Sequence, residues 1–314
     1  MSGRRGRPER SARRGWLARL GDLDRRWIYG VLAVALVVTI LQEPLFPDRP
    51  GLFVAPVYAA LETLPPGSPV LFSLEYSPSS APELEPMAMA MTRHALARDL
   101  RVCFVSLWPE GNALIHRILQ RMVQAEFPGA VAGENYAVLG YKTGGPLLIN
   151  AIRSDLGSMY PTDLAGRPLS SLPALAGVER LEDFGLVVSF SGGTPGLKEW
   201  ILFGGDPTGV PVAGGSTGVG SPEFLAYFPR QLVGLLAGLK GAAEYETALA
   251  EGHPELLPFP RPATGGMGPQ AVAHGIIVLF VIVGNLELMV AGSRRLMRRR
   301  GRNRERDDRG EERP

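Results

Sequence analysis

The fold of this chain is decided by residues 70–108, which read VLFSLEYSPSSAPELEPMAMAMTRHALARDLRVCFVSLW. Two short, almost entirely apolar runs, 70–76 and 102–108, enclose a segment whose apolar positions recur at helical spacing from about residue 85 to 98. A strand buried on both faces is apolar throughout, and the return to a neighbouring parallel strand needs a crossover, commonly a helix. This stretch therefore predicts one strand–helix–strand unit.

The same alternation continues along the chain. Further expected elements share these patterns: strands at 136–141, 186–190 and 210–213, and helices at 112–127, from Pro146, from Pro195 and at 221–250. Proline suits the first position of a helix because the N–H it lacks would be unpaired there. We therefore predict an α/β domain at 68–250 with a doubly wound, mostly parallel sheet, Rossmann-like or flavodoxin-like.

Two apolar segments flank this domain, and both are predicted to be transmembrane helices. The second, 271–292, carries one acid, Glu287, and the first, 27–46, has an uncharged apolar centre. About 20 helical residues are needed to cross roughly 30 Å of hydrocarbon, so the first is short unless its ends contribute. Gln42 and the three residues after it do not resemble a signal-peptide cleavage site, which favours an uncleaved signal anchor.

Arginine is concentrated at the two ends of the chain. Residues 1–26 contain nine arginines and residues 293–314 contain ten. Basic flanks stay in the cytoplasm, so both tails are predicted to be cytoplasmic and the central domain to lie outside the plasma (inner) membrane. Residues 46–270 agree, because 14 Lys plus Arg stand against 21 Asp plus Glu, a net charge of −7. Binding to anionic lipid, nucleic acid or an acidic partner is the alternative for the tails.

Two proline-rich segments join the domain to the membrane. Residues 47–67 are predicted to be a connector with a short helix near 55–64, and residues 251–270 a Pro/Gly-rich linker. The single cysteine, Cys103, lies in an apolar run and is predicted to pack in the core. One cysteine excludes an internal disulfide and with it a disulfide-stapled scaffold.

Glycine and hydroxyl residues follow three of the predicted strands. In chain order they are Lys142, Thr143 and Gly144, then Ser191, Gly192, Gly193 and Thr194, then Gly215, Ser216 and Thr217. Ligands of open α/β sheets bind at the carboxyl ends of the strands, and each group leads toward a helix start, which favours an anion. We therefore predict a small anionic ligand here, with tight turns as the alternative role of the glycines.

No complete catalytic set accompanies these loops. Residues 214–218 match G-x-S-x-G, which exposes a nucleophilic serine, but the exported region after Ser216 holds no Asp and only His253. Ser216 and Glu75, at the end of the first strand, are the candidate catalytic residues. The glycine motifs of dinucleotide and nucleotide sites are absent, so no cofactor is expected.

Metal-ligand spacing is absent as well. His94 and His116 lie inside expected helices without a second His or Cys nearby, so no metal site is expected. Gly234, Gly238 and Gly241 share one face of the expected helix 221–250, which indicates close approach by another element. That element is expected to be the domain's own sheet, and an interface with a second copy is the alternative.

These observations indicate a non-catalytic, membrane-anchored protein whose exported domain binds a partner or a small anionic ligand. Its expected partners are the lipid bilayer and other membrane proteins or copies of itself. Nucleic acid is not expected, because the basic tails are interpreted as orientation signals. The alternative is an envelope hydrolase or transferase that uses Glu75, Lys142 or Ser216 at the carboxyl ends of the strands.

Overall fold

The computed structural model describes residues 25–42, 49–282 and 285. Its chain separates into two compact units, an α/β unit from residue 44 to 267 and a helical unit from residues 1–43 and 268–314. The expected tail 293–314, most of the tail 1–26 and Glu287 lie outside the described residues.

The α/β unit is built on one six-stranded sheet with the order β3-β2-β1-β4-β5-β6. Its strands are β1 (Pro69–Glu75), β2 (Arg101–Ser106), β3 (Tyr136–Tyr141), β4 (Leu186–Ser191), β5 (Val212–Ser216) and β6 (Leu235–Ala237). Every neighbouring pair is parallel. The predicted α/β class is confirmed, and the sheet is wholly rather than mostly parallel. Of the two strand orders expected, Rossmann-like and flavodoxin-like, the structure has the Rossmann-like order.

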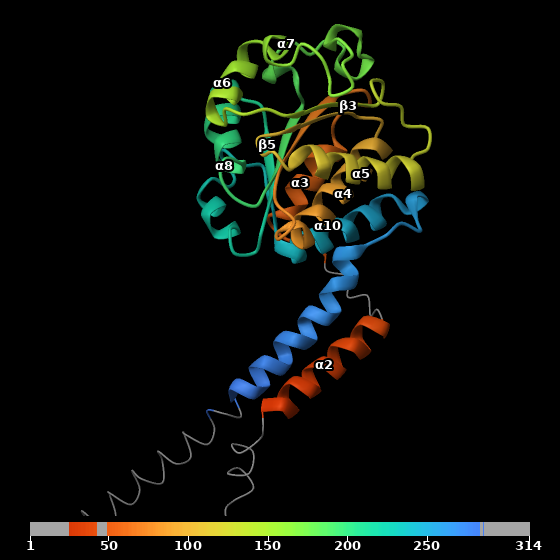
Figure 1. Cartoon of the computed structure of the whole chain (residues 1–314), viewed down its shortest axis with the longest axis vertical. Helices are drawn as coiled ribbons and strands as arrows, with labels where there is room; N and C mark the ends of the chain where they lie inside the picture. The colour runs from red at the N-terminus through yellow and green to blue at the C-terminus, as the bar shows by residue number, and fades with distance from the viewer. Residues whose placement is uncertain (1–24, 43–48, 283–284, 286–314) are drawn as a thin grey trace, which may run out of the picture. The chain divides into compact units, whose positions relative to one another are not determined.

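Helices cover both faces of the sheet (Figure 1). One face carries α3 (Val54–Glu62), α4 (Ala81–Ala97), α5 (Gly111–Ala125) and α10 (Gly238–Gly252). The other carries α6 (Pro146–Ser154), α7 (Leu156–Met159), and the consecutive α8 (Leu197–Glu199), π-helix η4 (Trp200–Gly205) and α9 (Asp206–Thr208). Short 3-10 turns complete the chain: η1 (Leu169–Ser171), η2 (Pro173–Leu175), η3 (Leu181–Asp183), η5 (Ser221–Ala226) and η6 (Pro254–Leu256).

Strand β1 contributes to the core on both faces. Phe72 and Leu74 pack with the layer of α4 and α10, whereas Leu71 packs with Trp200 and the opposite layer. All four side chains are fully buried. Successive side chains of a strand point to opposite faces, so a strand buried on both sides must be apolar at nearly every position. That is why the apolar runs identified the strands.

The predicted helix 221–250 is wrong in its first half. The segment forms η5, then a loop, then β6, and only from Gly238 the helix α10. Pro229 lacks the N–H that a helix interior needs. Gly238 has a φ of +58°, which separates β6 from α10 at a position where other residues would be strained.

Strand β5 extends further than predicted and contains Gly214 and Gly215, which were expected in a loop. Large side chains fill the space beside both glycines. A Cβ on Gly214 would lie 2.3 Å from Leu197 Cδ2, and one on Gly215 would lie 2.6 Å from Met87 Sδ. These glycines therefore allow helices to pack closely on both faces of the strand.

Gly234, Gly238 and Gly241 all lie against backbone of this chain. A Cβ on Gly234 would be 2.4 Å from the carbonyl oxygen of Phe53, and one on Gly241 would be 2.7 Å from the carbonyl carbon of Leu236. Gly238 faces Gly218, with 3.1 Å from its added Cβ to the Gly218 Cα. All three glycines thus allow close packing inside the domain. An interface with a second copy at these positions stays a prediction.

Among the described residues, one helix, Pro262–Ile282, has the length and apolar character that a membrane crossing needs. It begins inside the segment expected to be a linker, with proline at its start. The helix α2 (Arg25–Gln42) has a shorter apolar part, Tyr29–Gln42. Part of each expected span lies outside the described residues.

The start of helix Pro262–Ile282 is held by a buried acid of α10. Glu246, 1% exposed, accepts hydrogen bonds from the backbone N–H groups of Ala263 (3.1 Å) and Thr264 (2.8 Å) and from the Thr264 hydroxyl (2.7 Å). A helix start leaves such N–H groups without partners in the helix itself. Glu246 therefore acts as a cap supplied from another helix.

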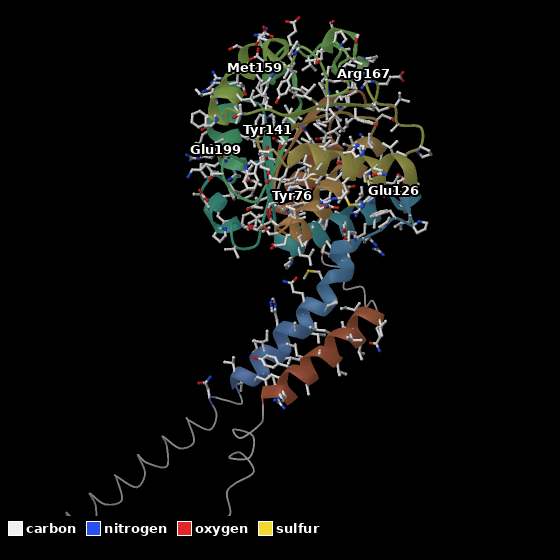
Figure 2. All side chains as sticks on the ribbon, viewed as in Figure 1. Tyr76, Glu126, Tyr141, Met159, Arg167 and Glu199 are labelled. Carbon is white, nitrogen blue, oxygen red and sulfur yellow. The ribbon has the colours of Figure 1, made fainter. Side chains whose placement is uncertain are left out.

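The segment before this helix also packs on the domain instead of forming a free linker. Phe259 is 7% exposed, and the Arg93 guanidinium carbon lies 4.4 Å from the centroid of its ring. Arg93, itself buried, donates through Nε and Nη2 to the Glu126 carboxylate. Glu126 is labelled in Figure 2. Arg93 of α4 thus contacts the Phe259 ring of this segment and also binds Glu126 at the end of α5.

Candidate functional site

A cavity of about 260 Å³ lies at the carboxyl ends of β4 and β5. Its lining includes six residues predicted from sequence: Ser191, Gly192, Gly193, Thr194, Ser216 and Thr217. The parallel strands β4 and β5 are neighbours, so the loops that leave them open at the same edge of the sheet. The structure therefore brings two of the three predicted groups together.

The loop after β4 is folded so that two of its backbone donors remain unused. The Ser191 hydroxyl donates to the Gly193 carbonyl at 2.7 Å, and the Gly192 N–H donates to the Glu75 carbonyl at 2.7 Å. The N–H groups of Gly193 and Thr194 donate no hydrogen bond to any described residue. They lie before the helical segment that starts at Leu197, whose N-cap N–H, on Gly196, donates to Oε2 of Glu199 at 2.6 Å.

A lysine that sequence reasoning missed stands at this cavity. Lys198 lines it, and its Nζ lies 3.0 Å from Oε1 of Glu223, which lines it as well. The hydrogen bond to Glu223 raises the pKa of Lys198. The signal in the sequence was its place in the first turn of a helix that follows a Gly-Gly-Thr loop.

The predicted group after β3 does not reach the cavity. Lys142, Thr143 and Gly144 are not among the residues that line it. The Lys142 ammonium donates to the Met159 carbonyl, and its Nζ lies 4.9 Å from the centroid of the Tyr160 ring. Lys142 is therefore occupied by the segment after α6, and neutralisation of a ligand by Lys142 has no support in this arrangement.

The edge where dinucleotides bind in Rossmann-like sheets is bridged by protein side chains. The indole N–H of Trp108, after β2, donates to the Pro195 carbonyl at 2.7 Å. A Cβ on Gly193 would meet the Trp108 ring at 3.3 Å, and one on Gly192 would meet the Ser80 hydroxyl at 2.7 Å. Serine and proline also replace the phosphate-binding glycines after β1. The residues present thus do not fit a dinucleotide.

Glu75, the last residue of β1, is fully buried. Its carboxylate accepts hydrogen bonds from the hydroxyls of Ser73 and Ser189, the latter at 2.8 Å, and from Nε1 of Trp200 at 3.5 Å. Burial raises its pKa to about 7 despite these donors. Glu75 has no exposed surface and is not among the residues that line the cavity, so a catalytic role for it stays a prediction.

Ser216 reaches the cavity without the partners that a nucleophile needs. Its hydroxyl makes no hydrogen bond with any described residue. Neither a histidine nor an aspartate lines the cavity, and its one acid, Glu223, is paired with Lys198. Activation of a serine requires an adjacent base held by a third group, and this geometry does not supply that pair.

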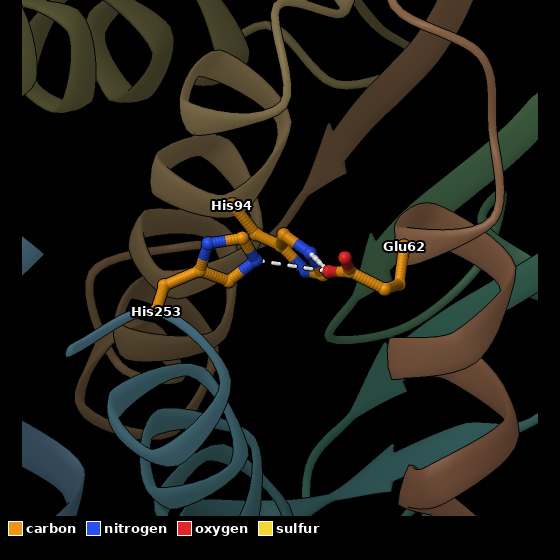
Figure 3. A group of neighbouring side chains, drawn as sticks. All are labelled: Glu62, His94 and His253. Carbon is orange, nitrogen blue, oxygen red and sulfur yellow. Dashed lines mark hydrogen bonds and ion pairs between the residues drawn. The ribbon is translucent and has the colours of Figure 1, made fainter. Parts of the chain in front are cut away.

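A second cluster joins three residues far apart in the sequence: Glu62 at the end of α3, His94 in α4 and His253 after α10 (Figure 3). Oε2 of Glu62 lies 2.8 Å from Nε2 of His94 and 2.9 Å from Nε2 of His253. Burial lowers the pKa of His94 to about 4, so its imidazole is neutral at physiological pH. Sequence spacing gave no signal for this cluster, because no two of its members lie in one local motif.

No protein family, curated protein or solved structure matches this chain. The fold, the cavity and the histidine cluster are therefore the observations from which a function can be inferred.

Proposed function

We propose that this chain is a membrane-anchored protein whose extracytoplasmic domain binds a small anionic group, without catalysis, in the cavity at the ends of β4 and β5. One observation carries this proposal. The cavity combines the unused N–H groups of Gly193 and Thr194, the hydroxyl of Ser216 and the cation Lys198. Backbone N–H donors, a hydroxyl and one positive charge form the recognition set of a phosphate or carboxylate.

The size of the cavity supports a small group rather than a cofactor. Pockets for drug-sized ligands occupy roughly 300–1,000 Å³, and this one encloses about 260 Å³. Lys198 supplies a positive charge in a region whose net charge, from residue 46 to 270, is −7. Binding would require the Lys198 ammonium to turn from Glu223 toward the ligand, a movement that its 40% side-chain exposure allows.

A hydrolase or transferase is the second candidate, and the Ser216 hydroxyl among the residues that line the cavity is the observation that favours it. The described lining residues include no histidine or aspartate, and the carboxylate of Glu223 is paired with Lys198, which weighs against it. Measurement of turnover in a Ser216→Ala variant separates the two candidates.

The membrane part of the proposal assigns two spans, both ends in the cytoplasm and the α/β domain outside. It is supported by the helix Pro262–Ile282, by the apolar part of α2 and by the arginine-rich ends. Val278, Leu279 and Ile282 are each more than half exposed, and such apolar surface is stable in lipid or against another helix. A place in a larger membrane assembly, with copies of this chain or other membrane proteins, belongs to the same proposal.

Inorganic phosphate is the probe we choose for the cavity. We expect phosphate to raise the melting temperature of the full chain in detergent, because a ligand that binds only the folded state stabilises it by about 2.7 kcal/mol at a hundred times its Kd. In Lys198→Ala the shift at a given phosphate concentration should fall by more than half. Lys240→Ala is the matched control, since it also removes a lysine but not one that lines the cavity.

If phosphate raised the melting temperature of Lys198→Ala as much as that of the wild type, the proposal that the cavity binds an anion would be wrong. A turnover measured in the wild type and lost in Ser216→Ala would replace the binding function by the enzymatic one.

Cysteine labelling tests the topology. We expect a maleimide that cannot cross membranes to modify Glu251→Cys in intact cells, because residue 251 is exposed at the end of α10. Ser293→Cys, in the arginine-rich tail, should be modified only after the cells are opened. Cys103 gives little background because it is fully buried. Labelling of Ser293→Cys with protection of Glu251→Cys would reverse the assigned orientation.

A further inference from the structure

We infer that Glu62, His94 and His253 form a binding site for a divalent transition-metal ion, and that zinc is the ion their chemistry fits best. Each residue offers one ligand atom, and the three atoms all lie within 4.8 Å of one another. Figure 3 shows the two imidazole rings converging on the Glu62 carboxylate from different segments. Two imidazoles and one carboxylate are a ligand set that zinc accepts with a fourth position left open.

The distances are close to those of a filled site. The two Nε2 atoms lie 2.8 and 2.9 Å from Oε2 of Glu62. Around a tetrahedral zinc with bonds near 2.0–2.1 Å, ligand atoms lie roughly 3.3 Å apart. The two distances to Glu62 would therefore need to lengthen by a few tenths of an ångström to admit the ion, and all three ligand atoms lie within 4.8 Å of one another.

The outer nitrogens of both rings have the partners that metal-binding histidines use. Nδ1 of His94 lies 2.7 Å from the Tyr245 hydroxyl, and Nδ1 of His253 lies 2.8 Å from Oε1 of Glu255. Such partners hold the orientation of an imidazole, and in both rings Nε2 is the nitrogen that faces Glu62.

The site is rigid on one side and open on the other. The His94 side chain is fully buried and stacks on the ring of Tyr58, with 4.7 Å between the ring centroids. Glu62 keeps a side-chain exposure of 34%, which gives an ion and a water ligand access. Arg98 is a competing cation, since its Nε lies 3.7 Å from Oε1 of Glu62, the oxygen that does not face the rings.

The place of the cluster in the fold indicates what a bound ion would do. His253 follows α10, where the chain turns toward the helix that starts at Pro262, and the other two ligands belong to α3 and α4. A metal ion would therefore fasten this turn to the domain. The sequence indicated no metal site because the ligands lie at positions 62, 94 and 253 and meet only in the folded chain.

Zinc titration of the full chain in detergent, after treatment with a chelator, tests this inference. We expect one zinc ion per chain, measured by competition with a zinc indicator, and a visible absorption band of tetrahedral cobalt when cobalt(II) replaces zinc. His253→Ala and Glu62→Gln should each weaken zinc binding at least 100-fold. Both residues are partly exposed, so these variants are expected to fold, which circular dichroism checks.

His116→Ala is the matched control, because it removes an exposed histidine of α5 that lies outside the cluster. Its zinc affinity should equal that of the wild type. Wild-type protein that binds no zinc, or zinc binding that survives in both His253→Ala and Glu62→Gln, would overturn the inference. Loss of binding only in His116→Ala would reveal adventitious surface binding and would overturn it as well.

Discussion

Replacement of Glu75 by glutamine is expected to stabilise the domain at about pH 8.5 by on the order of 3 kcal/mol and to leave its stability at pH 4 nearly unchanged. The cause is the burial of the Glu75 carboxyl, which raises its pKa from 4.5 to about 7. In the folded domain the proton is therefore held at pH values where the unfolded chain has already released it.

The direction of the effect follows from proton binding. Below pH 4.5 both states carry the proton, and the contribution of Glu75 to stability is fully present. As the pH rises from 4.5 through about 7, unfolding releases a proton, so the free energy of unfolding falls. Above that window the folded domain holds Glu75 as a buried carboxylate, and the decrease in the free energy of unfolding is complete. A glutamine is neutral throughout and has no such dependence.

The side chains around Glu75 can accommodate the amide. Ser73 and Trp200 donate to Oε1, which would remain a carbonyl oxygen, and Ser189 can turn its hydroxyl to accept from the new NH2 group. The backbone N–H of Leu107 also donates to Glu75 and needs the oxygen that remains. Burial raises the pKa of the nearby Tyr160 and Cys103, so both stay neutral in this window.

Denaturant unfolding followed by tryptophan fluorescence, at several pH values, measures the difference between Glu75→Gln and the wild type. Glu134→Gln removes an exposed carboxyl and is the matched control. A difference between Glu75→Gln and the wild type that does not change with pH would show that Glu75 has an ordinary pKa.

The second large effect is expected from Glu246→Ala, which should lower the free energy of unfolding of the domain by about 3 kcal/mol. The variant removes the acceptor of three buried hydrogen bonds and leaves the N–H groups of Ala263 and Thr264 buried without partners. Glu246→Gln should lose less, because its amide oxygen still accepts while its NH2 group faces another donor. Denaturant unfolding of the full chain in detergent measures both.

Glu251→Ala provides the comparison for Glu246→Ala. It removes a carboxylate from the same helix, at an exposed position near its end. We expect a change below about 0.5 kcal/mol there, as at most surface positions. Equal effects in the two variants would mean that the cap on the Pro262–Ile282 helix does not stabilise the domain.

The sheet was predictable because its strands are apolar on both faces, as in 70–76. Five strands were recognised this way, whereas β6 was missed because its three residues lie inside a longer apolar stretch. That stretch resembles a helix by composition, and Pro229 was the local signal against it. The order of the strands depends on contacts between distant segments, which no local pattern encodes.

The cavity was predictable in part for the same reason. Loops after β4 and β5 meet because all strands point the same way, so Gly193, Thr194 and Ser216 could be grouped from sequence. Lys142 follows β3 at the edge of the sheet, and its distance from β5 depends on strand order. The histidine cluster was not predictable, because tertiary packing alone brings His253 to His94.

The closing of the sheet by β6 and α10 has a consequence for synthesis of the chain. The ribosome makes α3 and α4 early, yet their apolar faces pack against α10, which is made after every strand. A nascent chain that ends before Gly238 therefore exposes apolar surface of its first helices. The packing of α3 and α4 in the folded domain is therefore completed only after α10 has been synthesised.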